Sequence, residues 1–280
     1  MKKVTITFVG AGALAGGIAP RLVERGYSIR EIVTRDGRSG RALARRVKAL
    51  ATNFANAAWS ADLVWLAVPD AAIAACAKRL TRLPHFSAAI VIHSSGALGS
   101  ELLSPLRACG AAVGSAHPMM TFVKGEPPKM KDVWWALEGD AKAVRAAREI
   151  TKALGSHSFA ISAGKKALYH AFGAFLSPML VSEMAAGSAL GLAAGVPRDK
   201  LSRVMAPIVR RTVENLLASG GPASFSGPLV RGDVDTIRLH LCALRSHPAE
   251  RDVYLALARY AVRALPVKKR NRLEELLREA

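Results

Sequence analysis

The feature that most constrains the fold of this chain is a glycine-rich turn between a strand-like run and a helix-like run. The strand-like run is Val4–Val9, and the helical pattern after the turn reaches Glu24. The turn itself reads Gly10, Ala11, Gly12, Ala13, Leu14 and Ala15. Gly10 permits a tight turn, Gly12 lets a ligand approach the backbone, and Ala15 is small enough for close helix–strand packing. Because the first N–H groups of a helix are unpaired and lie at its positive end, this pattern predicts a phosphate-binding turn.

The same N-terminal letters also resemble a secretory signal peptide, because two lysines precede an apolar run that contains small residues. The residues that follow argue against that interpretation. Arg25 and Gly26 close the first helix, a second strand is expected at Ile29–Thr34, and an amphipathic helix is expected at Gly40–Leu50. A cleaved peptide needs no such strand–helix–strand unit, so we interpret the turn as part of a folded dinucleotide-binding domain.

Apolar runs and helical patterns continue to alternate up to about residue 161. The later strands are expected at Leu63–Val68, Ala88–His93, Ala111–Ala116, Trp134–Glu138 and His157–Ile161, with helices at Ala71–Leu83 and Ala141–Leu154. Continuous apolar strands separated by helices specify a parallel sheet with both faces covered. The predicted fold class is therefore α/β, and residues 1–161 are predicted to form a doubly wound, mostly parallel Rossmann-like sheet.

Strand signals stop near Ser162, and residues 162–280 predict an all-α C-terminal domain for substrate binding and dimerisation. Its helices are expected at Lys165–Ala194, Arg198–Ser219, Asp233–Leu244 and Pro248–Leu265. Part of the first helix, Ala171–Val196, is apolar enough to suggest a membrane span, but it contains Glu183, several serines and many small residues. We favour burial in a helical core or between two subunits, and so expect a homodimer and no membrane contact.

The end of the second strand distinguishes between the two common dinucleotides. NAD sites usually place an acidic residue there, where it binds the ribose hydroxyls. In this chain the strand ends in Thr34 and Arg35, Arg38 is close behind, and Asp36 lies just beyond the strand. Arginine suits a 2′-phosphate, because its planar guanidinium makes charge-assisted contacts with phosphate oxygens. We therefore predict NADP, and Asp36 is the feature that would serve NAD instead.

Other strands end in residues typical of a ligand-binding rim, because ligands of doubly wound sheets bind beyond the carboxyl ends of the strands. His93 and His117 both lie at such ends, which is a stronger signal than either histidine alone. We predict a catalytic role for His117. The cofactor contacts predicted on this rim are Ala67, Val68, Pro69, Ser94 and Gly96.

In the helical half, Lys166, His170, Gly173 and Ser177 are spaced 4, 3 and 4 residues apart, so they share one face of a helix. Lys166 is predicted to polarise a carbonyl, and His170 to exchange the proton that accompanies a hydride. Ser177 is predicted to complete this catalytic stripe. The alternative is a solvated first turn, with Ser177 merely tolerating the kink at Pro178.

Charge and cysteine content exclude other classes of site. The net charge is +19, but aromatic residues make up only 6% and no basic run alternates with them, so nucleic-acid binding is not expected. The dense basic cluster, residues 267–272, is expected to be the exposed start of a terminal helix. Three scattered cysteines, Cys76, Cys109 and Cys242, have no metal-ligand spacing and suit a reducing compartment. We predict no metal site and a cytoplasmic location.

Taken together, the motifs of this chain resemble a family that pairs a Rossmann-like NADP-binding domain with a helical C-terminal domain of unknown function. The segments that carry the resemblance are GAGALA, AVPD, HSSGAL, GSAHPMMTF, KALYHAFGAFLSP and GPLVRGD. This family is similar to pyrroline-5-carboxylate reductases, ketopantoate reductases, β-hydroxyacid dehydrogenases and deazaflavin-dependent NADP oxidoreductases. The resemblance implies hydride transfer at a cleft between two domains, and a dimer formed through the helices. Relatives commonly carry Ser-Asn where this chain has Ser177 and Pro178.

The leading hypothesis is a cytoplasmic NADP-dependent oxidoreductase that acts on a small polar substrate. One alternative is a protein that binds NADP(H) as a sensor or scaffold without turnover. A weaker alternative is a basic nucleic-acid-associated protein. The sequence leaves open whether Arg231 and Asp233, in the GPLVRGD segment, form a structural ion pair or reach an active site.

Overall fold

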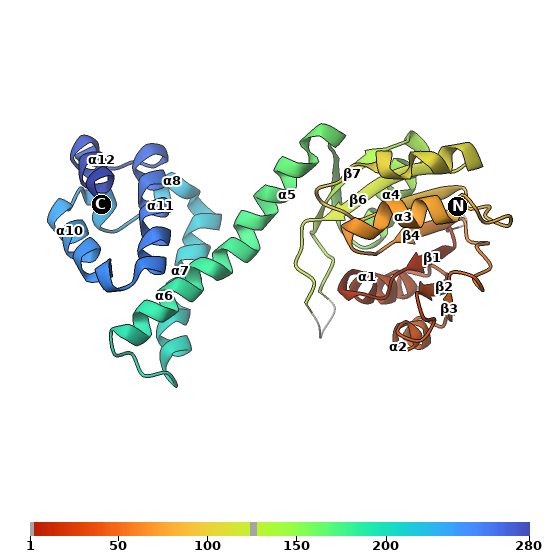
Figure 1. Cartoon of the computed structure of the whole chain (residues 1–280), viewed down its shortest axis with the longest axis horizontal. Helices are drawn as coiled ribbons and strands as arrows, with labels where there is room; N and C mark the ends of the chain where they lie inside the picture. Colours follow the sequence, from red (N-terminus) through yellow and green to blue (C-terminus); the bar gives the residue numbers. More distant parts are fainter. Residues whose placement is uncertain (1–2, 124–127) are drawn as a thin grey trace. The chain divides into compact units, whose positions relative to one another are not determined.

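The computed structural model of the chain describes residues 3–123 and 128–280. The chain forms two compact units, Met1–Phe175 and Leu176–Ala280. The first unit is α/β and the second is helical, which confirms the predicted fold class (Figure 1). The two units divide inside a continuous helical run and not at Ser162, where the strands end. The reason is that the first turns of this run pack on the sheet, where the Lys166 ammonium hydrogen-bonds Ser95, just after one strand, and Ser115, within the next.

One sheet of eight strands organises the first unit. The strands are β1 (Ile6–Val9), β2 (Ile29–Thr34), β3 (Leu50–Asn53), β4 (Leu63–Leu66), β5 (Ile90–His93), β6 (Ala112–Pro118), β7 (Trp134–Gly139) and β8 (His157–Ala160). Their order in space is β3-β2-β1-β4-β5-β6-β7-β8, and every neighbouring pair is parallel except β6 and β7. The direction of winding reverses between β1 and β4, which is the place where doubly wound sheets bind ligands.

Helices cover both faces of this sheet, as continuous apolar strands require. The helical elements of the unit are α1 (Ala13–Glu24), α2 (Arg41–Arg46), α3 (Asp70–Leu80), the 3-10 helix η1 (Ser100–Cys109), α4 (Ala141–Ala153), the short 3-10 turn η2 (Ala163–Lys165) and α5 (Lys166–Ala174). One buried cluster joins α1, α2 and α4 to one face of the sheet, and another joins α3 and η1 to the other face. Alternate residues of β4 serve the two clusters, with Trp65 in the first and Leu66 in the second.

One local prediction is wrong in the first unit, and one helical element was not predicted. The helix expected at Gly40–Leu50 ends at Arg46, because Lys48 takes a positive φ of 54° and Leu50 already pairs with β2 in the edge strand β3. The connection between β5 and β6 is the 3-10 helix η1, which the sequence pattern did not predict.

The second unit is built around three of its helices. Its elements are the π-helical turn η3 (Phe175–Met179), which begins at the last residue of the first unit, then α6 (Leu180–Ala193), α7 (Leu201–Ser219), α8 (Gly221–Ser224), α9 (Pro228–Arg231), α10 (Val234–Ala243), the 3-10 turn η4 (Leu244–Ser246), α11 (Pro248–Ala264) and α12 (Arg270–Glu279). The buried apolar residues come from α10, α11 and α12, which lie together in Figure 1. In contrast, α6 and α7 bury no residue.

In the part of the chain that the structure describes, one helical run is long and apolar enough to cross a membrane. This run is Ala163–Ala193, and it meets the criterion by length and composition only. A single such helix is weak evidence for a span. The residues of α6 are not buried within this chain, so the expected burial in a helical core of the same chain is not observed.

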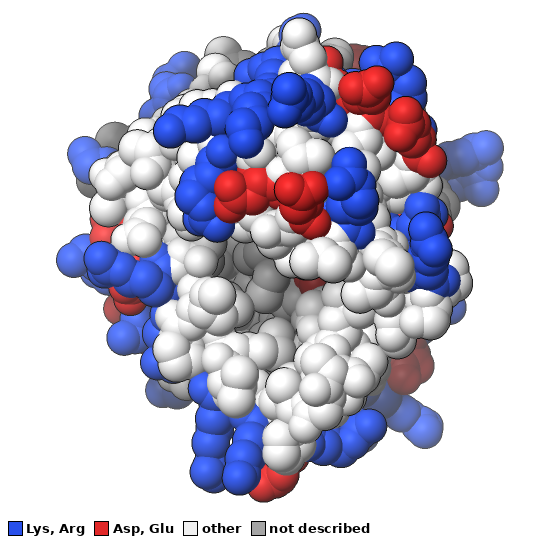
Figure 2. All heavy atoms as spheres, turned by 90° about the vertical axis from the view of Figure 1, so that its left-hand side faces the viewer, with Lys and Arg blue, Asp and Glu red and all other residues white. Residues whose placement is uncertain are grey.

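The basic cluster at residues 267–272 leads into α12, as predicted. The Arg270 guanidinium donates to the carbonyl oxygens of Arg263 and Leu265, at the end of α11, at 2.9 and 3.2 Å. Figure 2 faces the left-hand side of Figure 1 and shows Lys and Arg gathered along the top and the lower edge of this face, with Asp and Glu beside the upper group. Acidic side chains therefore accompany the basic ones on this face.

Candidate functional site

The glycine-rich turn joins β1 to α1 at the point where the winding reverses. Gly10 has a φ of 105°, and a Cβ atom there would lie 2.2 Å from the carbonyl oxygen of Ala67. Only glycine avoids both the strained backbone and this contact. The Gly10 N–H donates to the Val33 carbonyl at 2.8 Å, and the Ala67 N–H donates to the Val9 carbonyl at 2.8 Å. The end of β1 is thus held directly against the ends of β2 and β4.

The start of α1 has the features of an anion-binding helix terminus. The N-cap is Gly12, which has no side chain that could cap the helix, and the first turn contains no acidic residue. The first intrahelical bond runs from the Gly16 N–H to the Gly12 carbonyl at 2.9 Å, so the earlier N–H groups point out of the helix. A Cβ atom at Gly12 would meet nothing within 4 Å, whereas Ala15 is fully buried against the core. These residues fit a dinucleotide pyrophosphate.

The loop after β2 separates the roles of Asp36 and the two arginines. Oδ1 of Asp36 accepts hydrogen bonds from the backbone N–H groups of Arg38 and Ser39 and from the hydroxyls of Thr34 and Ser39, at 2.9–3.2 Å. These bonds, above all that of the Ser39 N–H, hold the pKa of the Asp36 carboxyl well below its usual range. The carboxylate therefore shapes its own loop. Arg35 and Arg38 are exposed, and their guanidinium groups have no partner among residues 3–123 and 128–280.

The ends of β4 and β5 form the next part of the rim. Ala67 and Val68 are half-buried beside the glycine-rich turn, and Pro69 is the N-cap of α3. On the neighbouring strand, the Ser94 hydroxyl accepts the indole N–H of Trp65 at 2.8 Å, so its position is fixed by the core. The predicted cofactor residues on these strands thus lie along one edge of the sheet.

His93 has a structural position in this rim. Its side chain is fully buried; Nδ1 accepts the Ser95 N–H at 3.1 Å, and Nε2 lies 3.1 Å from the Gly99 carbonyl oxygen. A carbonyl oxygen can only accept, so Nε2 carries the proton and His93 is a neutral ring that joins both ends of one turn. Burial lowers the pKa of His93 to about 4, with the nearby Lys166 ammonium adding to the effect.

Lys166 links α5 to the sheet and is buried over its whole side chain. Its Nζ donates to the Ser95 carbonyl oxygen at 2.9 Å and to the Ser115 hydroxyl at 2.8 Å. Both partners are neutral, and burial lowers the pKa of Lys166, while the charges of Glu138 and Asp70 oppose that change. The ammonium therefore bridges the turn after β5 and the middle of β6, and it supplies positive charge beneath the rim.

Two histidines converge above Gly96, one from the sheet and one from α5. A Cβ atom at Gly96 would lie 2.5 Å from Cδ2 of His170 and 2.8 Å from Nε2 of His117. The two imidazole rings are 5.9 Å apart at an angle of 82°. Burial lowers the pKa of His117 to about 4, and the charges of Lys166 and His170 act in the same direction. His117 is therefore a neutral imidazole near pH 7, which can donate or accept a hydrogen bond there.

The structure brings three of the four predicted catalytic residues together within the first unit. Lys166 and His170 lie on one face of α5, as their spacing predicted. His170 lies beside the ring of His117, and Lys166 hydrogen-bonds Ser115, two residues before His117 in β6. Ser177 belongs to the second unit and lies in the π-helical turn that contains Pro178. Its catalytic role stays a prediction.

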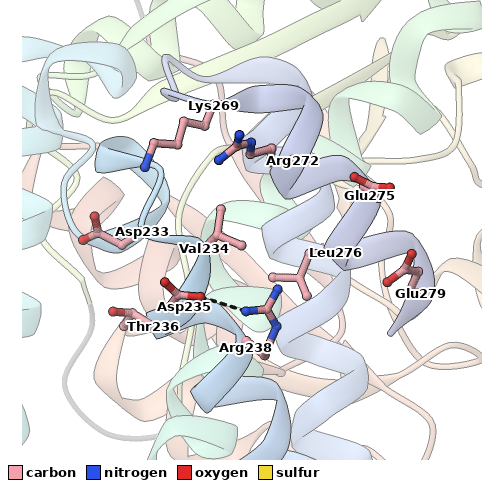
Figure 3. A pocket seen from close by; sticks show the side chains of 10 residues that line it. All are labelled: Asp233, Val234, Asp235, Thr236, Arg238, Lys269, Arg272, Glu275, Leu276 and Glu279. Atoms are coloured by element: carbon pink, nitrogen blue, oxygen red, sulfur yellow. Dashed lines mark hydrogen bonds and ion pairs between the residues drawn. The ribbon is translucent and has the colours of Figure 1, made fainter.

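A separate cleft of about 610 Å³ lies between α10 and α12 in the second unit (Figure 3). Acidic and basic side chains are interspersed around it, and Arg238 donates to Asp235 at 2.8 Å. At its edge, the Arg231 guanidinium pairs with the Asp233 carboxylate at 2.8 Å. Arg231 and Asp233, whose role the sequence did not decide, therefore form an ion pair with each other.

Sequence reasoning missed four residues of the first-unit site. Ser95 and Ser115 hold Lys166, Asp70 accepts the Ser95 hydroxyl at 2.8 Å, and the Tyr169 hydroxyl lies 3.2 Å from Nδ1 of His117. The serines stand in the same short segments as Ser94 and His117, and Tyr169 precedes His170. Their position in these segments could have suggested a role in the site. They were missed because their hydrogen-bond partners are 25 to 71 residues away in the chain.

Two family models match this chain, one in each half. Residues 5–95 match the NADP oxidoreductase, coenzyme F420-dependent family, and residues 133–261 match a domain of unknown function (DUF2520). These matches confirm the resemblance to a Rossmann-like NADP-binding family with a helical C-terminal domain. No curated protein matches the sequence significantly.

Solved structures with the same fold match along almost the whole chain. An inferred NADP oxidoreductase, BF3122 of Bacteroides fragilis, has 23% identity and a TM-score of 0.76, covering 92% of this chain and 97% of its own. Protein TM1727 of Thermotoga maritima has 21% identity and a TM-score of 0.73, covering 98% of both chains. A reductive aminase from Aspergillus terreus, solved with NADPH and ethyl levulinate, has 17% identity and a TM-score of 0.65, covering 99% of both chains. This chain therefore has the fold of NADP-dependent oxidoreductases.

Proposed function

We propose that this protein is a cytoplasmic NADP-dependent oxidoreductase that transfers a hydride between NADP(H) and a small polar substrate. The observation that carries the proposal is the arrangement of one sheet edge. Along that edge lie, in order, two exposed arginines after β2 that have no partner among the described residues, the uncapped helix terminus after β1, and a pair of histidines beside β5 and β6 near a buried ammonium. This is the order in which an extended dinucleotide presents its phosphates and then its nicotinamide.

The residues that would hold the cofactor follow from their surroundings. The N–H groups at the start of α1 would bind the pyrophosphate, and Arg35 and Arg38 would bind the 2′-phosphate. Asp36 would not bind the ribose, because its Oδ1 is occupied by its own loop. Ser94 and Gly96 would lie beside the nicotinamide. When bound, the cofactor supplies or accepts a hydride at its nicotinamide ring.

The residues around Gly96 would handle the substrate and its proton. Lys166 has no exposed surface, so it would act by holding Ser95 and Ser115 in place and by its positive field. A positive field stabilises negative charge on a carbonyl oxygen during hydride transfer. His117 and His170 present imidazole edges above Gly96 and would exchange the proton.

The test of the cofactor assignment is calorimetry with NADPH and NADH on the full chain. We expect a clear preference for NADPH and a loss of about 10- to 100-fold in NADPH affinity for Arg35→Ala, the cost of a charge-assisted hydrogen bond. Arg30→Ala is the matched control, because Arg30 is an exposed arginine at the other end of β2. Equal affinity for the two dinucleotides, or equal effects of the two variants, would contradict the 2′-phosphate assignment.

Turnover is tested by a screen of ketones, imines and 2-oxo acids for NADPH oxidation. Lys166→Ala and His170→Ala are expected to abolish turnover while NADPH binding persists. Binding of NADPH without any oxidation across the screen would favour the sensor or scaffold alternative. Retention of DNA at 0.5 M salt would favour the nucleic-acid alternative, because non-specific phosphate binding weakens steeply with salt.

We also propose that the protein is a homodimer whose interface includes α6 and α7. These helices have no buried residue in the chain, although they carry large apolar side chains such as Val181, Val204, Ile208 and Leu217. Helices of 14 and 19 residues gain most of their stability from packing an apolar face. An apolar surface of this kind on a soluble protein marks an interaction site.

A further inference from the structure

Tyr169 of α5 packs edge-on against His117 at the end of β6. The two ring centroids are 5.5 Å apart at 90°, and the phenol oxygen lies 3.2 Å from Nδ1 of His117. Tyr169 also has an apolar neighbour, because the ring of Phe159 in β8 lies 5.9 Å from the Tyr169 ring. Both His117 and Tyr169 are half-buried, so the strands and α5 restrict how either ring can turn.

The contact matters because a neutral imidazole carries its proton on only one of two nitrogens. The nitrogen that is protonated is decided by the partner of the other one. In His117, Nδ1 faces Tyr169, and the Nε2 edge faces Gly96 together with His170. Whatever partner Nδ1 has therefore decides whether the site offers a donor or an acceptor above Gly96.

The geometry favours the phenol as the donor to Nδ1. Among the residues that the structure describes, the only other acceptor within reach of the Tyr169 hydroxyl is the His117 carbonyl oxygen, at 3.5 Å, the outer limit of a hydrogen bond. That carbonyl oxygen is also used for pairing within the sheet. In an antiparallel ladder, every second pair of opposed residues is hydrogen-bonded. The Met119 N–H donates to the Trp134 carbonyl and the Asp140 N–H to the Val113 carbonyl, so His117 and Ala136, which lie between these bonds, also form a hydrogen-bonded pair. The Tyr169 hydroxyl therefore donates its hydrogen bond to Nδ1 of His117.

We propose that Tyr169 is a positioning residue that holds His117 in the Nε2–H tautomer, so that the site presents a hydrogen-bond donor above Gly96. A donor there selects a substrate that brings an acceptor, such as the oxygen of a ketone or the lone pair of an unprotonated imine. It disfavours a protonated iminium, whose N–H would meet another N–H. The statement about substrate rests on the proposed function, whereas the tautomer does not.

A matched control pair exists in the second unit. The hydroxyl of Tyr254 lies 3.1 Å from Nδ1 of His240, and the rings are 5.9 Å apart at 88°. This pair is on α10 and α11 and is more exposed than the first pair. Tyr254→Phe therefore removes the same kind of hydrogen bond from the other unit, and it controls for a general effect of losing a phenol.

The test is a two-bond ¹H–¹⁵N correlation spectrum of the full chain labelled with ¹⁵N-histidine. The chain has seven histidines, and His117→Gln identifies the signal of His117. We expect the Nε2–H pattern for His117 in the unmodified protein and in Tyr254→Phe. In Tyr169→Phe, we expect that pattern to be lost in favour of Nδ1–H or a mixture. An Nδ1–H pattern in the unmodified protein, or an unchanged Nε2–H pattern in Tyr169→Phe, overturns the proposal.

The spectrum needs neither cofactor nor substrate, so it separates this inference from the proposed function. If NADPH does not bind, the proposed function fails while the tautomer is still measured. If turnover is found, Tyr169→Phe should lower kcat about tenfold or more for a ketone and leave NADPH affinity unchanged. Circular dichroism of Tyr169→Phe and Tyr254→Phe checks that both variants are folded. Equal kcat for these two variants also counts against the proposal.

Discussion

Acid should destabilise the first unit through His93, and the size of the effect follows from its surroundings. The buried ring accepts one N–H and faces one carbonyl oxygen, and its pKa falls from the ordinary 6.5 to about 4. Between pH 6.5 and 4, His93 is therefore protonated in the unfolded chain but stays neutral in the folded chain. Stability is complete above pH 6.5 and is lost as the pH falls toward 4. The total loss from this one group is about 3 kcal/mol, with a slope of up to about 1.4 kcal/mol per pH unit.

Tryptophan fluorescence during urea unfolding measures this effect in the correct unit. The chain has four tryptophans, Trp59, Trp65, Trp134 and Trp135, and all four lie in the first unit. The free energy of unfolding would be measured at several pH values between 4 and 7 for the unmodified chain and for His93→Gln. We expect the variant to be less stable at pH 7, because a buried hydrogen-bonding ring is lost, but to have a shallower pH slope by about one proton.

Exposed His85 provides the control. His85→Gln should keep the slope of the unmodified chain, since that side chain is exposed and makes no hydrogen bond or ion pair with the described residues of the buried rim. His117 has a pKa lowered to about 4 as well, so part of the slope remains in His93→Gln. Parallel pH dependences for the unmodified chain and His93→Gln would refute the reasoning, because they would mean that His93 charges as readily in the folded chain as in the unfolded one.

Two further predictions concern packing. Gly96→Ala should lower the free energy of unfolding by about 1–3 kcal/mol, because its Cβ would lie 2.5 Å from His170 and 2.8 Å from His117. Gly164→Ala is the control, because a Cβ atom at Gly164 would have no atom of the described residues within 4 Å apart from its chain neighbours. Equal urea midpoints for the two variants would show that α5 does not lie on this rim. Ile208→Asp should convert the proposed dimer to a monomer in light scattering, whereas Leu239→Asp, at an equally exposed apolar residue of α10, should not. A dimer that survives Ile208→Asp would exclude this part of α7 from the interface.

The sequence alone determined the parts of this protein that depend on neighbouring residues. The glycine-rich turn, the strand before it and the helix after it are recognisable because Gly10 and Ala15 act within a few residues of each other. The same holds for the stripe that puts Lys166 and His170 on one face of α5. The loop at Asp36 was also within reach, since its hydrogen bonds span only two or three residues, although the carboxylate had been considered for a ribose.

Tertiary structure alone decided which distant residues meet. Lys166 bonds to Ser95 and Ser115, which are 71 and 51 residues away, and Tyr169 meets His117 across 52 residues. The antiparallel pairing of β6 and β7 and the edge strand β3 are likewise products of the whole sheet. The physical reason is that periodicity records which face of a segment is buried, but not what lies against it. For Lys166 this changes the chemistry, because a cation expected to touch a substrate is buried beneath two serines.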